Sequence, residues 1–414
     1  MHITHLSLTN FRNYGRLELT LPQGPILLYG NNAQGKTNLL EAIYYLATTR
    51  SPHADNDAQL LNWNATQAEE PLIVGRLNAT VATSKQTISL EMRLIQEQKI
   101  ARSRTRNFSF RRQALIDRRK VRLMDLLGMM RVVLFLPEDV QLLTGSPANR
   151  RRYMNITLCQ IDPVYCRTLS NYNKVLEQRN ATLRQLAEGQ PVRDVLPIYT
   201  EKLVELGSLI FLRRAKFLAN ISQQTQQIHY ESLTAGKESI KLLYLPRLNS
   251  SRSKVSPYEE QSTTELADWL ENHQGQSELV SERFGKLLAD SLATDIARGA
   301  TTIGPHRDDW TFQLNGRSLG SFGSRGQQRT AILALKMGEI NWMETATGER
   351  PILLLDEVVA ELDEQRRAAL LNAVTSTTQA ILTATDPGMF SDTFLQTATR
   401  MEVKNGRIQI AVQE

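Results

Sequence analysis

Eight residues near the N-terminus have the spacing Gly-x4-Gly-Lys-Thr of a phosphate-binding loop: Gly30, Asn31, Asn32, Ala33, Gln34, Gly35, Lys36 and Thr37. Its glycines let successive main-chain N–H groups turn toward phosphate oxygens. The N-terminus of a following helix also favours negative charge. In such a loop Lys36 bridges the β- and γ-phosphates of ATP and Thr37 holds Mg²⁺. The loop therefore predicts ATP and Mg²⁺ as cofactors.

Two adjacent carboxylates, Asp356 and Glu357, end the apolar run that begins at Pro351. A run of this length is typical of a short buried strand. At the tip of such a strand, Asp356 would coordinate Mg²⁺ directly or through water, and Glu357 would orient or deprotonate the attacking water. An apolar strand ending in two acids is common by itself. Its catalytic interpretation depends on the loop upstream.

A serine ahead of a helical pattern forms the third element. Ser324-Arg325-Gly326-Gln327 precedes apolar residues at helical spacing from Ala331 to Trp342. The N-terminus of a helix is itself an anion site. Lys36, Asp356, Glu357 and Ser324 are therefore the predicted catalytic residues, and one nucleotide site is assembled from both ends of the polypeptide.

The sequence around these residues predicts the elements that must hold them. Residues 26–29 read as a buried strand, and Leu39, Leu40, Ile43 and Leu46 recur at the spacing of one helix face. Strand, glycine loop and helix thus follow in the order that a phosphate-binding loop requires. A hairpin pattern opens the chain, and a second one surrounds Asn405-Gly406 near its end.

The three motifs together carry a family resemblance. Ser-x-Gly-Gln ahead of a helix resembles the signature motif of ABC-type ATPases, and residues 360–363 stand where their D-loop would. Further motifs narrow the match, and the chain resembles the RecF family of bacterial recombination mediators from residue 1 to about 410. The motifs that carry this resemblance are residues 10–14 (Asn-Phe-Arg-Asn-Tyr), 35–43, 135–139 (Phe-Leu-Pro-Glu-Asp), 146–147 with 151–152, 172–180, 304–309 (Gly-Pro-His-Arg-Asp-Asp) and 326–330.

The resemblance implies an α/β fold, an ABC-type P-loop ATPase head with a β-rich N-terminal half and a helical inserted arm. In ABC-type ATPases the signature serine of one subunit contacts the γ-phosphate held by the other, which implies an ATP-dependent homodimer. The family further implies binding of duplex, gapped or single-to-double-strand junction DNA in recombinational repair, replication-fork maintenance and the SOS response. RecR and RecO would be partners in loading RecA. The expected enzyme is a weak, DNA-stimulated ATPase that acts mainly as a switch.

Several positions depart from the family pattern. Ala33 stands where glycine is usual, Met154-Asn155 follows the double arginine where Leu-Asp is usual, and Ser51-Pro52-His53 replaces a more basic Ser-x-Arg. The strand expected at residues 380–382 leads into Thr383-Ala384-Thr385-Asp386, without the switch histidine of other ABC-type ATPases. Similar sequences of the family also lack this histidine, so we expect slow hydrolysis.

Basic residues cluster in the N-terminal third. The chain carries a net charge of +6, and nine basic residues between positions 101 and 123 face the single acid Asp117. Arginine forks suit phosphate oxygens, and Phe108 and Phe110 lie within the run, so it is a candidate DNA surface. A solvated charged loop is the alternative. The candidate DNA-binding residues are Arg102, Arg104, Arg106, Arg111, Arg112, Arg118, Arg119, Lys120 and Arg122, together with Arg150, Arg151 and Arg152.

Composition and pattern divide the chain into three segments. With 41% hydrophobic and 22% charged residues it is ordinary for a globular protein. No stretch reads as a membrane span, and no signal peptide opens the sequence, so we expect a cytoplasmic protein without membrane partners.

Residues 1–125 are predicted as the first half of the head, residues 126–298 as the helical arm, and residues 299–414 as the second half of the head. The arm lacks the sustained heptads of a long coiled coil.

Two alternative functions remain at this stage. A nucleotide-gated DNA-binding module would have the same motifs but negligible turnover. A transporter ATPase subunit would lack both the large helical insertion and the basic run.

His306, Asp308 and Asp309 resemble a metal-ligand set only weakly. Cys159 and Cys166, seven residues apart in an apparently helical stretch, are expected to be buried and too far apart for a disulfide.

Overall fold

The structure is a computed structural model that describes residues 1–67, 70–99, 107–190, 193–249 and 257–410. The chain divides into two compact units. The first contains residues 1–139 and 339–414, and the second contains residues 140–338. The first unit is therefore built from both ends of the chain, and the second is an insertion between them.

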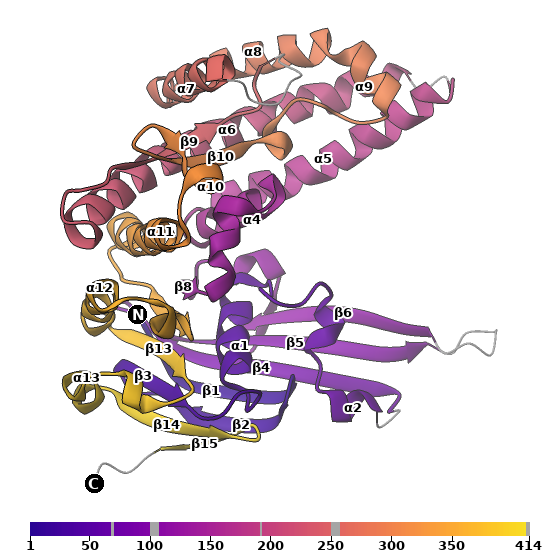
Figure 1. The fold of residues 1–414 in the computed structure, drawn as a ribbon. Coiled ribbons are helices and arrows are strands. Elements are labelled where there is room, and N and C mark those ends of the chain that lie inside the picture. The colour runs from indigo at the N-terminus through magenta and orange to yellow at the C-terminus, as the bar shows by residue number, and fades with distance from the viewer. Residues whose placement is uncertain (68–69, 100–106, 191–192, 250–256, 411–414) are drawn as a thin grey trace. The chain divides into compact units, whose positions relative to one another are not determined.

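An antiparallel sheet of six strands forms one layer of the first unit (Figure 1). Its apolar residues alternate with polar ones, which is the pattern of strands with one buried face. The predicted N-terminal hairpin is confirmed, with Leu8 opposite Leu17. In sheet order the strands are β2 (Tyr14–Thr20), β1 (His2–Phe11), β4 (Leu72–Ala82), β5 (Thr87–Lys99), β6 (Asn107–Ile116) and β7 (Arg119–Val121).

The second sheet of this unit is mostly parallel, and it joins segments from both ends of the chain. Its central strands are mostly apolar and buried along nearly their whole length, because helices and the other sheet cover both faces. The C-terminal hairpin around Asn405-Gly406 is confirmed as its antiparallel edge. In sheet order the strands are β15 (Arg407–Ile410), β14 (Thr399–Lys404), β3 (Gly24–Tyr29), β13 (Gln379–Ala384), β12 (Ile352–Asp356) and β8 (Val132–Phe135).

Helix α1 (Lys36–Thr48) packs between the two sheets and contacts strands of both. Ten of its thirteen residues are buried, so the helix is apolar nearly all round, as expected for an enclosed helix. The core of the unit surrounds it. The shorter helices of the unit are η1 (Asp57–Leu60), α2 (Trp63–Gln67), η2 (Leu123–Asp125), η3 (Pro137–Val140), η7 (Val358–Glu361), α12 (Glu364–Thr375), η8 (Pro387–Met389) and α13 (Asp392–Thr397).

The second unit combines long helices with a small antiparallel sheet. Helices α5 (Pro163–Ala187) and α6 (Leu196–Gln227) pack along each other, and α6 ends in a π-helical turn at Ile228–Leu233. The sheet has the order β11 (Arg317–Ser318), β10 (Asp309–Leu314) and β9 (Ile240–Leu245). The other helices are α3 (Gln141–Thr144), α4 (Pro147–Ile161), η4 (Arg193–Val195), α7 (Pro257–Asn272), α8 (Ser277–Asp290), α9 (Leu292–Arg298), η6 (Pro305–Arg307) and α10 (Leu319–Phe322). Helix α11 (Arg325–Thr347) runs across the boundary at residues 338 and 339.

Both predicted boundaries of the inserted arm differ from the boundaries of the second unit. Residues 126–139 belong to the first unit, because β8 pairs with β12 in its parallel sheet. Residues 299–338 belong to the second unit, because β10 pairs with β9 there. Short strands inside a mainly helical pattern gave too weak a periodic signal to place these edges.

Candidate functional site

The parallel sheet gathers three motif-bearing loops at one edge. Because β3, β13, β12 and β8 are parallel neighbours, their carboxyl ends lie on the same side of the sheet. The phosphate-binding loop follows β3, Asp356 ends β12, and Glu138 follows β8 by a few residues. Residues from positions near 30, 138 and 356 therefore meet at one site.

The phosphate-binding loop has a main chain that only a glycine-rich sequence adopts readily. Gly30 has φ +145° and Gly35 has φ +115°. A Cβ atom would lie 2.4 Å from the carbonyl oxygen of Val403 at Gly30, and 2.5 Å from the Asn13 amide nitrogen at Gly35. Ala33, where the family usually has glycine, has φ 63° and thus a left-handed conformation that costs about 1 kcal/mol.

Hydrogen bonds from two distant hairpins hold this loop in place. The phenol of Tyr14 donates to the carbonyl of Gly35 at 2.9 Å, and the Asn13 amide donates to the carbonyl of Gln34 at 2.9 Å. From the C-terminal hairpin, the Gly406 N–H donates to the same Gln34 carbonyl at 3.0 Å. The Asn405 N–H donates to the Gln34 side chain at 2.7 Å. The first and last hairpins of the chain therefore brace the loop together.

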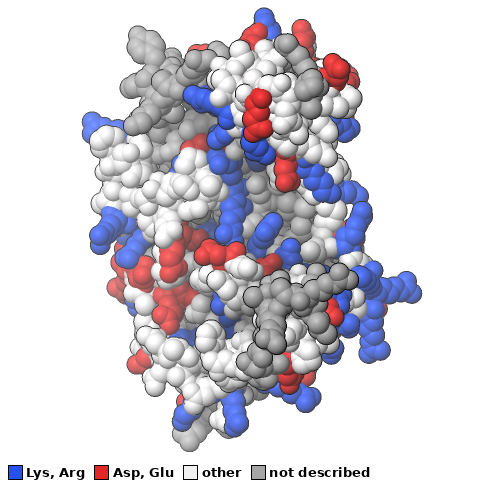
Figure 2. Space-filling view, turned by 90° about the vertical axis from the view of Figure 1, so that its right-hand side faces the viewer, with Lys and Arg blue, Asp and Glu red and all other residues white. Residues whose placement is uncertain are grey.

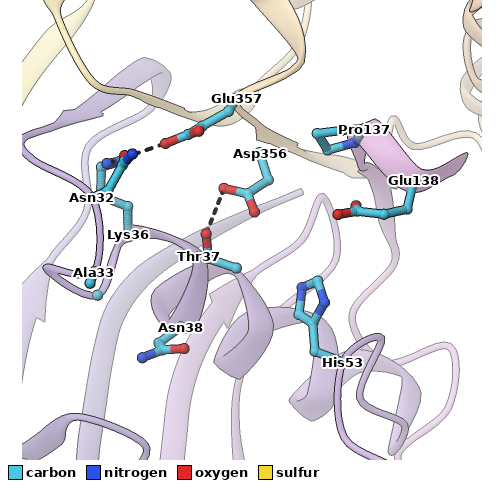
Figure 3. A pocket seen from close by; sticks show the side chains of 11 residues that line it. Asn32, Ala33, Lys36, Thr37, Asn38, His53, Pro137, Glu138, Asp356 and Glu357 are labelled. Carbon is cyan, nitrogen blue, oxygen red and sulfur yellow. Dashed lines mark hydrogen bonds and ion pairs between the residues drawn. The ribbon is translucent and has the colours of Figure 1, made fainter.

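Lys36 is buried at the start of α1, and its ammonium group points back over the loop. Its Nζ donates to the carbonyls of Gly30 at 2.7 Å and Asn31 at 3.1 Å. The same Nζ lies 3.3 Å from Oε1 of Glu357 (Figure 3). The side chain of Lys36 is 3% exposed, whereas that of Glu357 is 40% exposed. The buried ammonium thus meets a carboxylate that reaches solvent.

Asp356 is fixed by two threonines. The hydroxyl of Thr37 donates to Oδ1 of Asp356 at 3.0 Å, and the hydroxyl of Thr383 donates to the same oxygen at 2.7 Å. Thr383 also accepts a hydrogen bond from the N–H of Glu357 at 3.0 Å. Glu357 itself has a left-handed main chain with φ 52°. Thr383, on the neighbouring strand β13, therefore positions both carboxylate residues.

A pocket of about 370 Å³ lies against these residues, and it contains two that the sequence analysis did not select. The side chains of His53 and Glu138 point into it, together with those of Thr37 and Asp356 (Figure 3). Glu138 lies in a motif used above only to recognise the family, and His53 was noted only as a departure from it. The apolar run Val132–Phe135 ahead of Glu138 is too short to place it here from the sequence alone.

The loop that carries His53 is tied to α1 through a buried carboxylate. Ser51 Oγ accepts hydrogen bonds from the N–H groups of His53 at 3.0 Å and Ala54 at 2.7 Å, and donates to Glu41 at 2.5 Å. Glu41 also receives two hydrogen bonds from Arg12, at 2.7 and 2.8 Å. Glu41 is 1% exposed, so the pair is shielded from solvent. His53 therefore projects from an anchored main chain.

The donor set suits Mg²⁺. Magnesium prefers oxygen ligands and is commonly held by one or two carboxylates together with phosphates and water. The Thr37 hydroxyl and the Asp356 carboxylate face the pocket from adjacent elements, and the Glu138 carboxylate lies across from them (Figure 3). When bound, Mg²⁺ would neutralise phosphate charge and polarise the bond to the γ-phosphate.

Ser324 lies in the second unit and caps α11. Its Oγ accepts from the N–H of Gln327 at 3.2 Å, and the Gln327 side chain accepts from the N–H of Ser324 at 2.9 Å. This reciprocal pair is a capping box, which fixes the helix start. Phe322, Ser324, Arg325 and Gly326 are all exposed, and Phe322 is 77% exposed. The signature segment therefore forms a rigid, solvent-facing surface.

The Gly304–Asp309 segment also lies in the second unit, where each candidate metal ligand is engaged by protein groups. Asp308 is fully buried and accepts from Arg214 at 2.8 Å, from the Tyr244 phenol at 2.5 Å and from the Arg247 N–H at 2.7 Å. His306 contacts the Tyr172 phenol at 2.7 Å and the Thr301 carbonyl at 3.0 Å. These contacts give the segment a structural role.

Part of the predicted basic surface lies on an exposed hairpin. Strands β6 and β7 form a hairpin whose turn residues, Asp117 and Arg118, both have positive φ. Arg102, Arg104 and Arg106 lie outside the described residues. Arg122 also pairs with Asp125 at 3.3 Å. The exposed cations of the hairpin are Arg111, Arg118, Arg119, Lys120 and Arg122.

Two of the predicted DNA-binding arginines are internal. Arg112 points to the opposite face of β6 from Arg111, pairs with Asp57 at 2.9 Å and donates to the Thr49 carbonyl. Arg150 makes two hydrogen bonds to Asp309, at 2.6 and 2.7 Å, and is 11% exposed. In this structure both guanidinium groups are engaged by acids of the chain itself. Arg151 is half-buried and donates to the Asp308 carbonyl, whereas Arg152 is exposed.

The expected separation of the two cysteines was wrong. Helix α4 ends at Ile161 and α5 begins at Pro163, so Cys159 and Cys166 lie on different helices. Their thiols interact, and the hydrogen bond from Cys159 lowers the pKa of Cys166 while raising that of Cys159. Both cysteines are free. The proline that starts α5 was the sequence signal for this break.

Comparison with known proteins agrees with this architecture. Residues 2–409 match the family model described as the RecF/RecN/SMC N terminal domain. Among the described residues, no helix is both long and apolar enough to cross a membrane. An SMC head structure matches with a TM-score of 0.50 at 12% identity over 99% of this chain and 97% of that one, a likeness that shows the fold alone.

Curated relatives and solved structures narrow the assignment. The chain is 39% identical over 415 residues to the DNA replication and repair protein RecF of Chloroflexus aggregans, and 36% identical to that of Geobacillus thermodenitrificans, covering 99% of both chains in each case. A structure described as the recombination mediator protein RecF with ATP in the RecFOR pathway matches with a TM-score of 0.80 at 27% identity, over 99% of this chain and 98% of that one. The chain therefore belongs to the RecF family of the RecF/RecN/SMC proteins and has their ABC-type ATPase fold.

Proposed function

We propose that this chain is an ATP-gated clamp for DNA that acts in recombinational repair and replication-fork maintenance. The observation that carries the proposal is the convergence of Lys36, Thr37, Asp356 and Glu357 on one pocket. A relative of similar fold is described with ATP bound, which supports ATP as the nucleotide here.

In the proposed site each residue has a distinct task. Lys36 would exchange its contact with Glu357 for the β- and γ-phosphate oxygens, while main-chain N–H groups of residues 30–35 surround the β-phosphate. Thr37 and Asp356 would hold Mg²⁺. Glu357, released from Lys36, would orient or deprotonate the attacking water. Thr383 would keep both carboxylates aligned.

ATP would act as the link between two copies of the chain. The exposed signature segment carries a capped serine at a helix N-terminus, which suits contact with the γ-phosphate held by a second copy. Hydrolysis would remove this link and release the dimer. Thr383 on β13 lies beside the two carboxylates, and residues 383–386 at the end of this strand include no switch histidine, which favours slow turnover.

The proposed DNA surface includes the exposed cations of the β6–β7 hairpin. Figure 2 shows exposed Lys and Arg side chains on one face of the molecule, with Asp and Glu side chains among them. Guanidinium groups bind phosphate oxygens and make affinity fall with salt. The proposal further includes gapped or junction DNA as the ligand, RecR and RecO as partners, and help in RecA loading and the SOS response. The RecF structure described within the RecFOR pathway supports these partners.

The test measures binding of fluorescent gapped DNA by anisotropy, with and without ATP and Mg²⁺, for wild type and for a variant with Arg118, Arg119 and Arg122 changed to Glu. We expect ATP to strengthen binding of the wild type, and the variant to lose about 10-fold or more in affinity. Equal binding with and without ATP would favour a plain DNA-binding module. Unchanged affinity of the variant would remove the hairpin from the DNA surface.

A further inference from the structure

A second pocket, of about 450 Å³, lies wholly within the second unit. Its lining residues come from α8 and α9, from the segment after β9 and from the loop that leads to η6. Three arginines, Arg247, Arg298 and Arg307, line it, together with the single acid Asp290. The lining is therefore strongly cationic.

The buried acids behind this pocket already have their own cations. Asp295 is paired with Arg179 at 2.9 Å, and Asp308 with Arg214 at 2.8 Å, and all four side chains are at most 1% exposed. Because each buried carboxylate is neutralised from within, the pocket arginines are not required to compensate it. The positive charge of Arg298 and Arg307 is thus left for an external group.

The arginines project from an ordered frame. The N–H of Arg247 donates to Asp308 at 2.7 Å, and the N–H of Gly304 donates to the Arg247 carbonyl at 3.1 Å. The Arg247 guanidinium also contacts the Asn249 side chain at 3.4 Å. Thr302, on the pocket wall, is fixed by two hydrogen bonds to Asp295, at 3.0 and 2.7 Å. The pocket wall is held by partly buried hydrogen bonds within the second unit.

Arg298 and Arg307 are the most accessible of the three. Both are exposed, and neither makes an ion pair within the part of the chain that the structure describes. Arg307 makes one long contact, at 3.5 Å, to the Thr301 carbonyl. Two guanidinium groups that line one cationic pocket can both donate to the non-bridging oxygens of one phosphate.

We propose that this pocket binds a phosphate of the DNA backbone, as a second anion site separate from the ATP pocket. The inference rests on the proposed function, because it names where on the second unit the DNA is held. A phosphodiester can enter such a pocket without any base being read, so the site would contribute affinity and orientation but no sequence preference.

The experiment changes Arg298 and Arg307 together to Gln and measures binding of gapped DNA, with ATP and Mg²⁺, over a series of NaCl concentrations. The matched control changes Lys216 and Lys241 to Gln, which removes the same charge from exposed positions outside the pocket. We expect the pocket variant to bind about 10-fold more weakly at ~0.15 M salt. The slope of the logarithm of its binding constant against the logarithm of salt concentration should be smaller in magnitude by about 1 to 2. The control should match wild type.

Nucleotide binding and thermal melting of both variants show that they are folded. If wild type binds DNA and the pocket variant keeps its affinity and slope, the proposal is overturned. If wild type binds no DNA, the proposed function itself fails, and this inference with it. A further arm compares melting in phosphate and in chloride. Protection of the wild type by inorganic phosphate that the pocket variant loses, with DNA binding intact, would assign the pocket to free phosphate instead of DNA.

Discussion

The hydroxyl of Thr37 donates a hydrogen bond to Oδ1 of Asp356 at 3.0 Å, although 319 positions separate the two residues. This bond joins the helix that follows the phosphate-binding loop to the strand that ends in the two carboxylates. The site therefore exists only when both ends of the chain have folded into one unit. Interruption of that unit by a separate insertion leaves the site intact, because every residue of the pocket lies within residues 32–138 or at 356–357.

Changing Thr383 to Ala tests the residue that holds both carboxylates. The change leaves the Glu357 N–H without its acceptor and removes one donor from Asp356. We expect turnover of ATP to fall about 10- to 100-fold, since a small displacement of a positioned group has effects of this size. ATP binding should change little.

Thr383→Ser is the matched control, because it retains the hydroxyl, and it should restore most of the turnover. Steady-state hydrolysis and fluorescent-nucleotide binding give the two readouts. A similar loss of activity in the Ala and Ser variants would show that the methyl group of Thr383, and not its hydrogen bonds, is what matters.

Changing Asp308 to Asn should destabilise the second unit by about 3–5 kcal/mol, because it leaves the buried Arg214 guanidinium without its counter-charge. Burial raises the pKa of Asp308 to about 6, so the carboxylate is ionised at pH 7.5. Urea unfolding measures the change. Tyr244→Phe is the milder control, since it removes one neutral donor and should cost about 1 kcal/mol. Equal losses in the two variants would contradict the importance of the ion pair.

His306 makes stability depend on pH. Its Nε2 donates to the Thr301 carbonyl and its Nδ1 accepts from the Tyr172 phenol, which fixes the neutral form. Burial, with Arg307, Arg151 and Arg214 nearby, lowers the pKa of His306 to about 4, whereas the unfolded value is about 6.5. The folded state therefore binds fewer protons at His306 than the unfolded state does. The contribution of neutral His306 to the free energy of unfolding is present above pH ~6.5 and is lost as the pH falls toward 4.

Through His306, the free energy of unfolding of the wild type should fall by about 2 kcal/mol between pH 7 and pH 5. The raised pKa of Asp308 acts in the opposite direction over the same range, because its folded state holds a proton more tightly. The prediction therefore concerns a difference: His306→Gln should lose about 2 kcal/mol less than wild type over these two pH units. Parallel pH profiles of the two proteins would rule out this assignment.

The sequence predicted the elements of the head closely, because their signals are local. The apolar run before Gly30 and the helical spacing after Thr37 became β3 and α1, and the Asn405-Gly406 turn became the β14–β15 hairpin. Long helices were equally clear, and the stretches beginning near Tyr165 and at Leu196 became α5 and α6.

Features that depend on distant pairing could not be read in this way. Strand β8 has only four residues, and its neighbour β12 is more than two hundred positions away, so its place in the sheet was missed, and with it the position of Glu138. The partners of Arg112 and Arg150 are likewise acids far along the chain. A charge count cannot separate such paired arginines from those that face solvent.

The most direct test of the central claim is sedimentation of the protein on gapped DNA, with and without ATP and Mg²⁺. It compares wild type with Lys36→Arg, which weakens the contact to phosphate, and with Glu357→Gln, which retains the nucleotide but slows hydrolysis by about 10² to 10⁴. We expect an ATP-dependent dimer for wild type, a longer-lived dimer for Glu357→Gln, and no dimer for Lys36→Arg. Monomers of Glu357→Gln in the presence of ATP and Mg²⁺ would contradict the clamp.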